Sequence, residues 1–200
     1  TEASHIIDDI LEEMVKEKSR KHLTPAILKA ELKTRFAKRL ESKSELQSGK
    51  LKRCFHGIAN HVAVIPKTLA PPVFDGAPRP GEWQESLRVD NFLKRCGDAK
   101  PRHDTSVNMC YDDKHLYLLF SCQEGTSKKL LASHTKRDGK IWRDDSVEFF
   151  FQPSLKQDKY YQFIVNSIGA VFDSYDKNAG WNSRIRAAAS RDGDTGRWFV

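Results

Sequence analysis

The stretch from Ile141 to Asn166, IWRDDSVEFFFQPSLKQDKYYQFIVN, constrains the fold of this chain more than any other. Two runs rich in aromatic and β-branched residues flank a polar loop that contains Pro153, a pattern typical of an antiparallel β-hairpin. Side chains alternate across a strand, so one face of this hairpin is apolar and predicts a core. The members of that face are Val147, Phe149, Phe151, Tyr161, Phe163 and Val165.

The opposite face of the hairpin is polar and aromatic. If residues 153–157 form the loop, a carboxylate and an amide lie opposite each other, with two rings beside them. Together with Trp142, this grouping suits a polar, ring-shaped ligand. The pairs expected in this register are Asp144 with Asn166, Glu148 with Gln162, and Phe150 with Tyr160.

Further strand patterns follow residue 83. Residues 105–122 read as a second hairpin, TSVNMCY and HLYLLFSC joined by a DDK turn. Residues 169–175 and 184–189 also alternate, and a last strand begins near Gly196. Many short strands with polar turns and no intervening helices predict an antiparallel β-sandwich, so the fold class is mainly β.

The first third of the chain has a different pattern. Apolar residues recur at helical spacing over about residues 4–18, 24–40 and 44–58, and this periodicity disappears at Ile65, where a proline-rich segment begins. We therefore predict a helical region over residues 1–65, a proline-rich linker and sandwich entry over 66–82, and a β-sandwich over 83–200. The terminal GRWFV reads as a strand, so we expect the sandwich to be truncated at its C-terminus.

The net charge of +7 comes mostly from the N-terminal third. A basic helix surface can attract nucleic acid, but a solvated helix face explains the same residues and is the reading we favour, because no nucleic-acid-binding signature accompanies them. Nucleic acid therefore stays an alternative partner for the helical region. The basic series in its second helix is Lys29, Lys33, Arg35, Lys38 and Arg39.

Several other features limit the possibilities. No run of about 18 apolar residues is present, so no membrane insertion is expected, and the first 20 residues are too charged for a secretory signal. The sequence starts at Thr1 without a methionine, so we expect a piece of a longer protein. The four cysteines lack zinc-finger spacing. Asp112 and Asp113 favour turn chemistry, with a structural calcium ion as the alternative.

From about residue 70 onward the chain resembles the family 9 carbohydrate-binding modules and their DOMON-like relatives. The resemblance rests on an ordered series of motifs that covers about two thirds of the chain. These motifs are VFDG at 73–76, MCYDDKHLYLLF at 109–120, IWRDDSVEFFF at 141–151, YYQFIVNSIG at 160–169, NAGW at 178–181 and RWF near the end.

This resemblance implies a site and a function. Modules of this family are β-sandwiches that hold the end of a sugar chain between two tryptophans, while polar side chains reach the hydroxyl groups. By similarity, Trp142 and Trp181 are the two plates, and Glu148, Gln162 and Asn178 are the hydroxyl partners. The expected partner is an oligosaccharide or polysaccharide, no cofactor is required, and a secreted or cell-surface location follows.

Other functions remain as alternatives. No nucleophile elbow, P-loop, HExxH or dinucleotide motif appears, and strand alternation separates Asp144 from Asp145, so we predict no enzyme activity for the β-domain. An attached catalytic domain outside this chain is compatible with that prediction. DOMON-like relatives include haem-binding domains, for which Met109 is an available axial ligand, although alternation places it with the core. A purely structural or protein-contact module is the third reading.

Overall fold

The computed structural model describes residues 2–17, 25–41, 43–44, 48, 63–94, 100–126, 129–154 and 156–200. Contacts divide the chain into two units. The helical unit is Thr1–Val64 with Gln152–Asp158, and the β unit is Ile65–Phe151 with Lys159–Val200. Whether the predicted boundaries at residues 65 and 82 separate independently folding domains stays a prediction. No described helix is long and apolar enough to cross a membrane.

The helical unit contains α1 (Glu2–Lys16) and α2 (Pro25–Leu40), which bring their apolar stripes together. The expected third helix at 44–58 lies almost entirely outside the described residues. Two of the basic side chains of α2 are ion-paired: Arg35 with Glu17, and Arg39 with Glu13. The buried residues of this small core are Ile7, Ile10, Met14, Leu32, Phe36 and Leu40.

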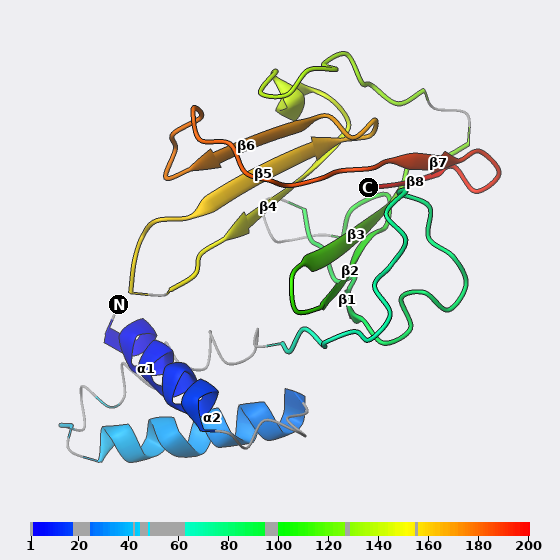
Figure 1. Cartoon of the computed structure of the whole chain (residues 1–200). Helices are drawn as coiled ribbons and strands as arrows, with labels where there is room; N and C mark the ends of the chain where they lie inside the picture. The colour runs from blue at the N-terminus through cyan, green and yellow to red at the C-terminus, as the bar shows by residue number, and fades with distance from the viewer. Residues whose placement is uncertain are drawn as a thin grey trace. The chain divides into compact units, whose positions relative to one another are not determined.

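The β unit holds two antiparallel sheets, consistent with the predicted β-sandwich (Figure 1). The five-stranded sheet has the order β1-β2-β3-β8-β7 and the three-stranded sheet the order β4-β5-β6. The strands are β1 (Leu87–Val89), β2 (Thr105–Tyr111), β3 (Leu116–Gln123), β4 (Ser146–Phe151), β5 (Tyr161–Asn166), β6 (Val171–Tyr175), β7 (Ser190–Asp192) and β8 (Arg197–Phe199). Residues 184–189, predicted as a strand, form no ladder, although Ile185 and Ala187 still pack on the core.

The core of the β unit lies between the two sheets. Val107, Phe120 and Trp198 from the five-stranded sheet form one buried cluster with Val147 and Val165 from the three-stranded sheet. The odd-numbered residues of the β4–β5 hairpin therefore face inward, as the alternation predicts. Met109 also packs against this cluster, as expected from its place in the sequence.

The turn between β2 and β3 uses its carboxylates locally. Asp112 accepts hydrogen bonds from the backbone N–H groups of Lys114 and His115 and from the Tyr117 hydroxyl, each at 2.7 Å. The Tyr117 hydroxyl, helped by the Lys114 N–H, holds the pKa of Asp112 at about 2. Asp113 forms an ion pair with Lys67. Among the described residues, no three His, Cys, Asp or Glu side chains gather as a metal site.

The register of the β4–β5 hairpin differs from the expected one by two residues. Glu148 lies opposite Ile164, and Phe150 lies opposite Gln162. The ladder ends at Phe151, two residues before Pro153, which has no N–H to donate to a ladder, so the loop is longer than predicted. Because the shift is an even number, each side chain stays on its predicted face.

Candidate functional site

The outward side of the three-stranded sheet carries a mixed polar and aromatic surface, which we call the outer face. It is formed by even-numbered residues of β4, β5 and β6 together with Trp142, which stands in the short 3-10 helix η2 (Ile141–Arg143) just before β4. Its polar and aromatic side chains are Trp142, Glu148, Phe150, Tyr160, Gln162, Phe172 and Ser174.

A hydrogen-bonded polar row crosses the outer face. The Gln162 side-chain amide donates to the Glu148 carboxylate, and the Ser174 hydroxyl donates to the Gln162 carbonyl at 3.1 Å. Gln162 lies directly opposite Ser174 and diagonally opposite Glu148, which is within reach of long side chains. Glu148 and Gln162 therefore lie side by side and offer an acceptor and a donor to a ligand, whereas Ser174 is buried and supports the Gln162 side chain.

Aromatic pairs flank this row. Trp142 is 52% exposed, and its ring makes a T-shaped contact with Phe172 at a centroid distance of 5.4 Å. On the other side Phe150, 54% exposed, packs against Tyr160 at 5.5 Å. Exposed aromatic rings beside hydrogen-bonding groups match a ligand that has both apolar patches and hydroxyl groups.

The short helix η2, which carries Trp142, ends at a buried carboxylate, Asp144. The side chain of Asp144 is fully buried and accepts hydrogen bonds from the backbone N–H groups of Ser133 and His134 and from the Asn166 amide. The His134 ring nitrogen lies 3.0 Å from the same carboxylate. Burial by itself would raise the pKa of Asp144, but the hydrogen bonds from His134, Asn166 and Ser133 outweigh it and hold the pKa at about 2.

The neighbouring carboxylate, Asp145, accepts a hydrogen bond from the Leu131 N–H at 2.7 Å. Asp144 and Asp145 therefore both accept hydrogen bonds from the backbone of residues 131–134 and hold that segment against the start of β4. The expected register paired Asp144 with Asn166 in the ladder. In the structure Ser146 takes that place, and Asp144 reaches Asn166 through its side chain from outside the strand.

Two of the predicted site residues do not lie on the outer face. The Trp181 ring packs against Tyr161 at 5.1 Å and Phe163 at 6.3 Å, which point inward. Trp142 and Trp181 thus contact opposite faces of the same sheet, and the expectation that the two rings face each other is corrected. Trp181 follows the turn after β6, where the Tyr161–Tyr175 pair offers it aromatic surface to cover.

Asn178 lies in the exposed turn between β6 and Trp181, and its side-chain oxygen accepts a hydrogen bond from the Gly180 N–H at 3.0 Å. The structure thus brings together Trp142, Glu148 and Gln162, but not Trp181 or Asn178, whose roles in binding stay predictions. Phe172 and Ser174 were missed as site residues. The alternation of residues 169–175 carried the signal, because it places both on one face of the strand that follows Gln162.

Comparison with known proteins identifies the family to which this chain belongs. The sequence profile of carbohydrate-binding family 9 matches residues 90–199. The chain therefore belongs to a class of non-catalytic binding modules, and its family is carbohydrate-binding family 9. The match covers β2 to β8 and includes every residue of the outer face.

One solved structure is similar in outline. It is a candidate carbohydrate-binding protein from Bacteroides uniformis, with 19% sequence identity, a TM-score of 0.44 and 69% coverage of each chain. A search of curated proteins finds no match.

Proposed function

We propose that the outer face is the sugar-binding surface of this module, and that it binds an oligosaccharide or polysaccharide without chemical conversion. The observation that carries the proposal is the hydrogen-bonded row of Glu148, Gln162 and Ser174 between the exposed rings of Trp142 and Phe150. Membership of carbohydrate-binding family 9 makes a sugar the expected ligand.

The chemistry of a sugar ring explains this arrangement. A pyranose has apolar C–H patches on its faces and hydroxyl groups around its edge. Trp142 supplies a platform for a ring face, and the Glu148 carboxylate and Gln162 amide supply an acceptor and a donor for the hydroxyl groups. A sugar hydroxyl can both donate and accept, so it can pair with either the Glu148 carboxylate or the Gln162 amide and leave neither without a hydrogen-bond partner.

A panel of immobilised glycans tests the proposal, followed by calorimetric titration of the best ligand. We expect binding that the double variant Trp142→Ala/Glu148→Ala abolishes. The matched control is the double variant Trp83→Phe/Glu85→Ala, which changes the same residue types outside the outer face. A panel on which no glycan binds, or binding that survives in the Trp142→Ala/Glu148→Ala variant, contradicts the proposal.

The other readings have their own signatures in the same preparation. A haem-binding domain shows a Soret band in its absorbance spectrum, whereas a sugar module shows none. If no glycan binds and no Soret band appears, a structural or protein-contact role becomes the leading function. A secreted or cell-surface location remains part of the proposal, because extracellular polysaccharide would be the ligand.

A further inference from the structure

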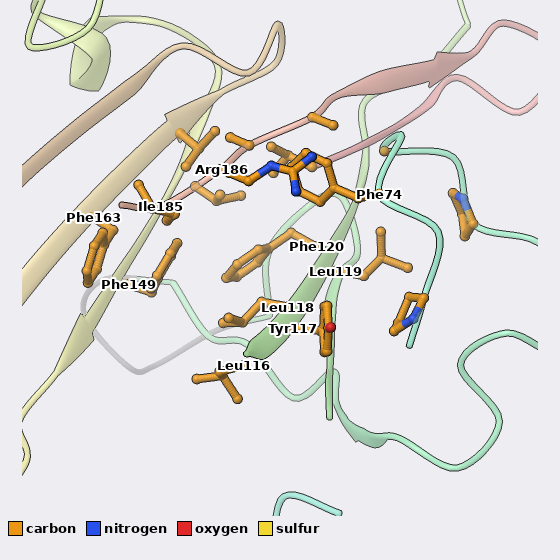
Figure 2. A pocket seen from close by; sticks show the side chains of 18 of the residues that line it. Phe74, Leu116, Tyr117, Leu118, Leu119, Phe120, Phe149, Phe163, Ile185 and Arg186 are labelled. Atoms are coloured by element: carbon orange, nitrogen blue, oxygen red, sulfur yellow. The ribbon is translucent and has the colours of Figure 1, made fainter. Parts of the chain in front are cut away.

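A cavity of about 300 Å³ lies inside the β unit, between the inner surfaces of the two sheets (Figure 2). A volume of this size lies at the lower end of the range of ligand pockets. The walls are almost entirely apolar. They include Leu118 and Phe120 of β3, Phe149 of β4, Phe163 of β5, and Ile185 and Ala187.

The cavity reaches the surface of the β unit. Three of its lining side chains are substantially exposed: Val73 by 56%, Phe74 by 45% and Leu116 by 40%. Two of them belong to the loop over residues 72–83, which forms one wall and carries the VFDG sequence. A ligand could therefore enter along this loop without unfolding either sheet.

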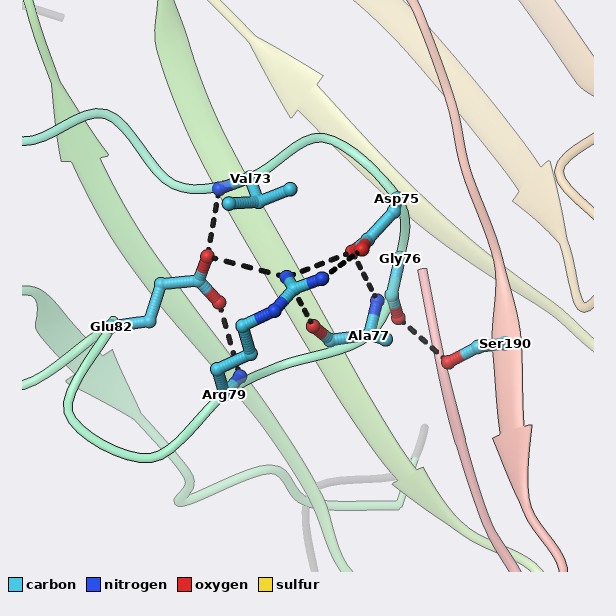
Figure 3. Close-up of polar contacts among 7 residues, drawn as sticks. All are labelled: Val73, Asp75, Gly76, Ala77, Arg79, Glu82 and Ser190. Carbon is cyan, nitrogen blue, oxygen red and sulfur yellow. Dashed lines mark hydrogen bonds and ion pairs between the residues drawn. The ribbon is translucent and has the colours of Figure 1, made fainter.

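Polar contacts within loop 72–83, and one contact from the loop to Ser190, hold its conformation (Figure 3). Glu82 accepts hydrogen bonds from the N–H groups of Val73, at 2.7 Å, and Arg79, at 3.1 Å, and Arg79 also pairs with Asp75. On the opposite side, the Ser190 hydroxyl donates to the Gly76 carbonyl at 2.8 Å.

Gly76 also lets the loop approach the neighbouring segment closely. It has a φ of +76°, and a Cβ there would lie 2.8 Å from the backbone of Ala188. Loop 72–83 therefore holds a fixed position against residues 183–190, so the cavity mouth is preformed.

The mouth of the cavity carries one positive charge, the Arg186 guanidinium, that is not paired with a carboxylate of the described residues. The Arg186 guanidinium lies over the Phe74 ring, 4.2 Å from its centroid, and both residues line the cavity. Glu82 also lines the cavity, but its oxygens are occupied by Val73 and Arg79. Among the described residues, no carboxylate forms an ion pair with Arg186. A cation at the rim of an apolar cavity favours a ligand with an anionic head and an apolar body.

We propose that this cavity is a second binding site, which takes an apolar monocarboxylate with its hydrocarbon part inside and its carboxylate against Arg186. A cavity of about 150 Å³ lined by Leu, Ile and Phe accommodates benzene, so a space about twice as large holds a chain of roughly ten to twelve carbons. This site is separate from the outer face, because its walls are the inward side chains of the sheets, and it does not depend on the proposed sugar binding.

Calorimetric titration with decanoate, and in parallel with the uncharged 1-decanol, tests the proposal. We expect decanoate to bind with one molecule per chain. Arg186→Gln should weaken decanoate binding about fivefold, the scale of an exposed ion pair, and leave 1-decanol binding unchanged. Arg184→Gln is the matched control, since Arg184 is exposed two residues away and does not line the cavity.

A variant that fills the space tests where the chain lies. Ala187→Phe should abolish binding of both decanoate and 1-decanol, and thermal unfolding of the variant checks that it still folds. If it does not fold, Leu116→Trp narrows the cavity from its exposed rim and serves the same purpose. Absence of decanoate binding, binding of many molecules per chain, or equal affinity in a folded cavity-filling variant overturns the proposal. Glycan binding, measured on the same variants, is expected to be unchanged.

Discussion

The two faces of the three-stranded sheet are built from the same three strands and differ in almost every property. The inner face carries Phe149, Phe163 and Val165, which pack into the core between the sheets. The outer face carries a hydrogen-bonded carboxylate, amide and hydroxyl beside rings that are about half exposed. The alternation of side chains along these strands thus places the packing residues on one side and the residues of the proposed sugar site on the other.

Matched changes on the two faces should therefore have opposite consequences. A change on the inner face should lower stability, whereas a change on the outer face should weaken binding and leave the fold intact. The largest effect is expected for a buried ring and the smallest for the polar row.

Truncation of an inner ring should have the largest effect. Phe163 is 8% exposed and stacks on Phe149 at 5.1 Å, so Phe163→Ala should lower the free energy of unfolding by about 3–5 kcal/mol. Phe150→Ala, the same change on the exposed outer face, should cost under about 1 kcal/mol. Urea unfolding of both variants measures the difference. Equal losses would contradict the assignment of the two faces.

The buried Asp144 carboxylate should make stability depend on acid pH. Its pKa in the folded protein is about 2, below the ordinary 3.8, so the ionised form stabilises the fold above about pH 4. That contribution is lost as the pH falls from about 4 toward 2, because protonation breaks the bonds to Ser133, His134 and Asn166.

Asp144→Asn should lower the free energy of unfolding at pH 7 by about 2–3 kcal/mol and flatten its pH dependence below pH 4. Urea unfolding at several pH values measures both effects. Asp138→Asn is the control, because Asp138 is an exposed carboxylate at a positive φ that asparagine tolerates. An unchanged pH slope in Asp144→Asn would show that another group controls acid unfolding.

The two tryptophans separate binding from stability. Trp142→Ala should weaken binding of the sugar found on the glycan panel by about 1–3 kcal/mol and leave unfolding nearly unchanged, because the ring is exposed. Trp181→Ala should do the reverse and cost about 1–2 kcal/mol of stability, because its ring covers Tyr161 and Tyr175. Calorimetric titration and urea unfolding of both variants provide the test. A loss of sugar binding in a stable Trp181→Ala protein would restore the two-tryptophan arrangement.

The polar row should give the smallest effect. Gln162→Ala removes one hydrogen-bonding partner of Glu148 and, under our proposal, one of the ligand, so binding should weaken by about 1–2 kcal/mol. Asn178→Ala, an amide change in an exposed turn that adds no residue to the outer face, separates our proposal from the family-based prediction: unchanged affinity is expected if the outer face alone binds the sugar. Equal weakening by the two changes would bring Asn178 into the site.

Much of this molecule is determined by local sequence pattern. The alternation in residues 146–151 and 161–166 decides which side chains face the core and which face outward, because consecutive residues of a strand point in opposite directions. The same pattern, repeated over short strands with polar turns, gives the β-sandwich class. The motif series identifies carbohydrate-binding family 9, which the family match confirms.

Only the tertiary structure decided the rest, because it depends on contacts between residues far apart in the chain. The length of the loop around Pro153 set the hairpin register, which alternation specifies only to within an even number of residues. Trp181 covers the inner side of the three-stranded sheet because the Tyr161–Tyr175 pair lies there. Asp144 is a buried hydrogen-bond acceptor because residues 133, 134 and 166 donate to it. The cavity beside Arg186 likewise forms because the side chains of the two sheets and of loop 72–83 leave space between them. These elements are far apart in the sequence, so no local pattern predicts the cavity.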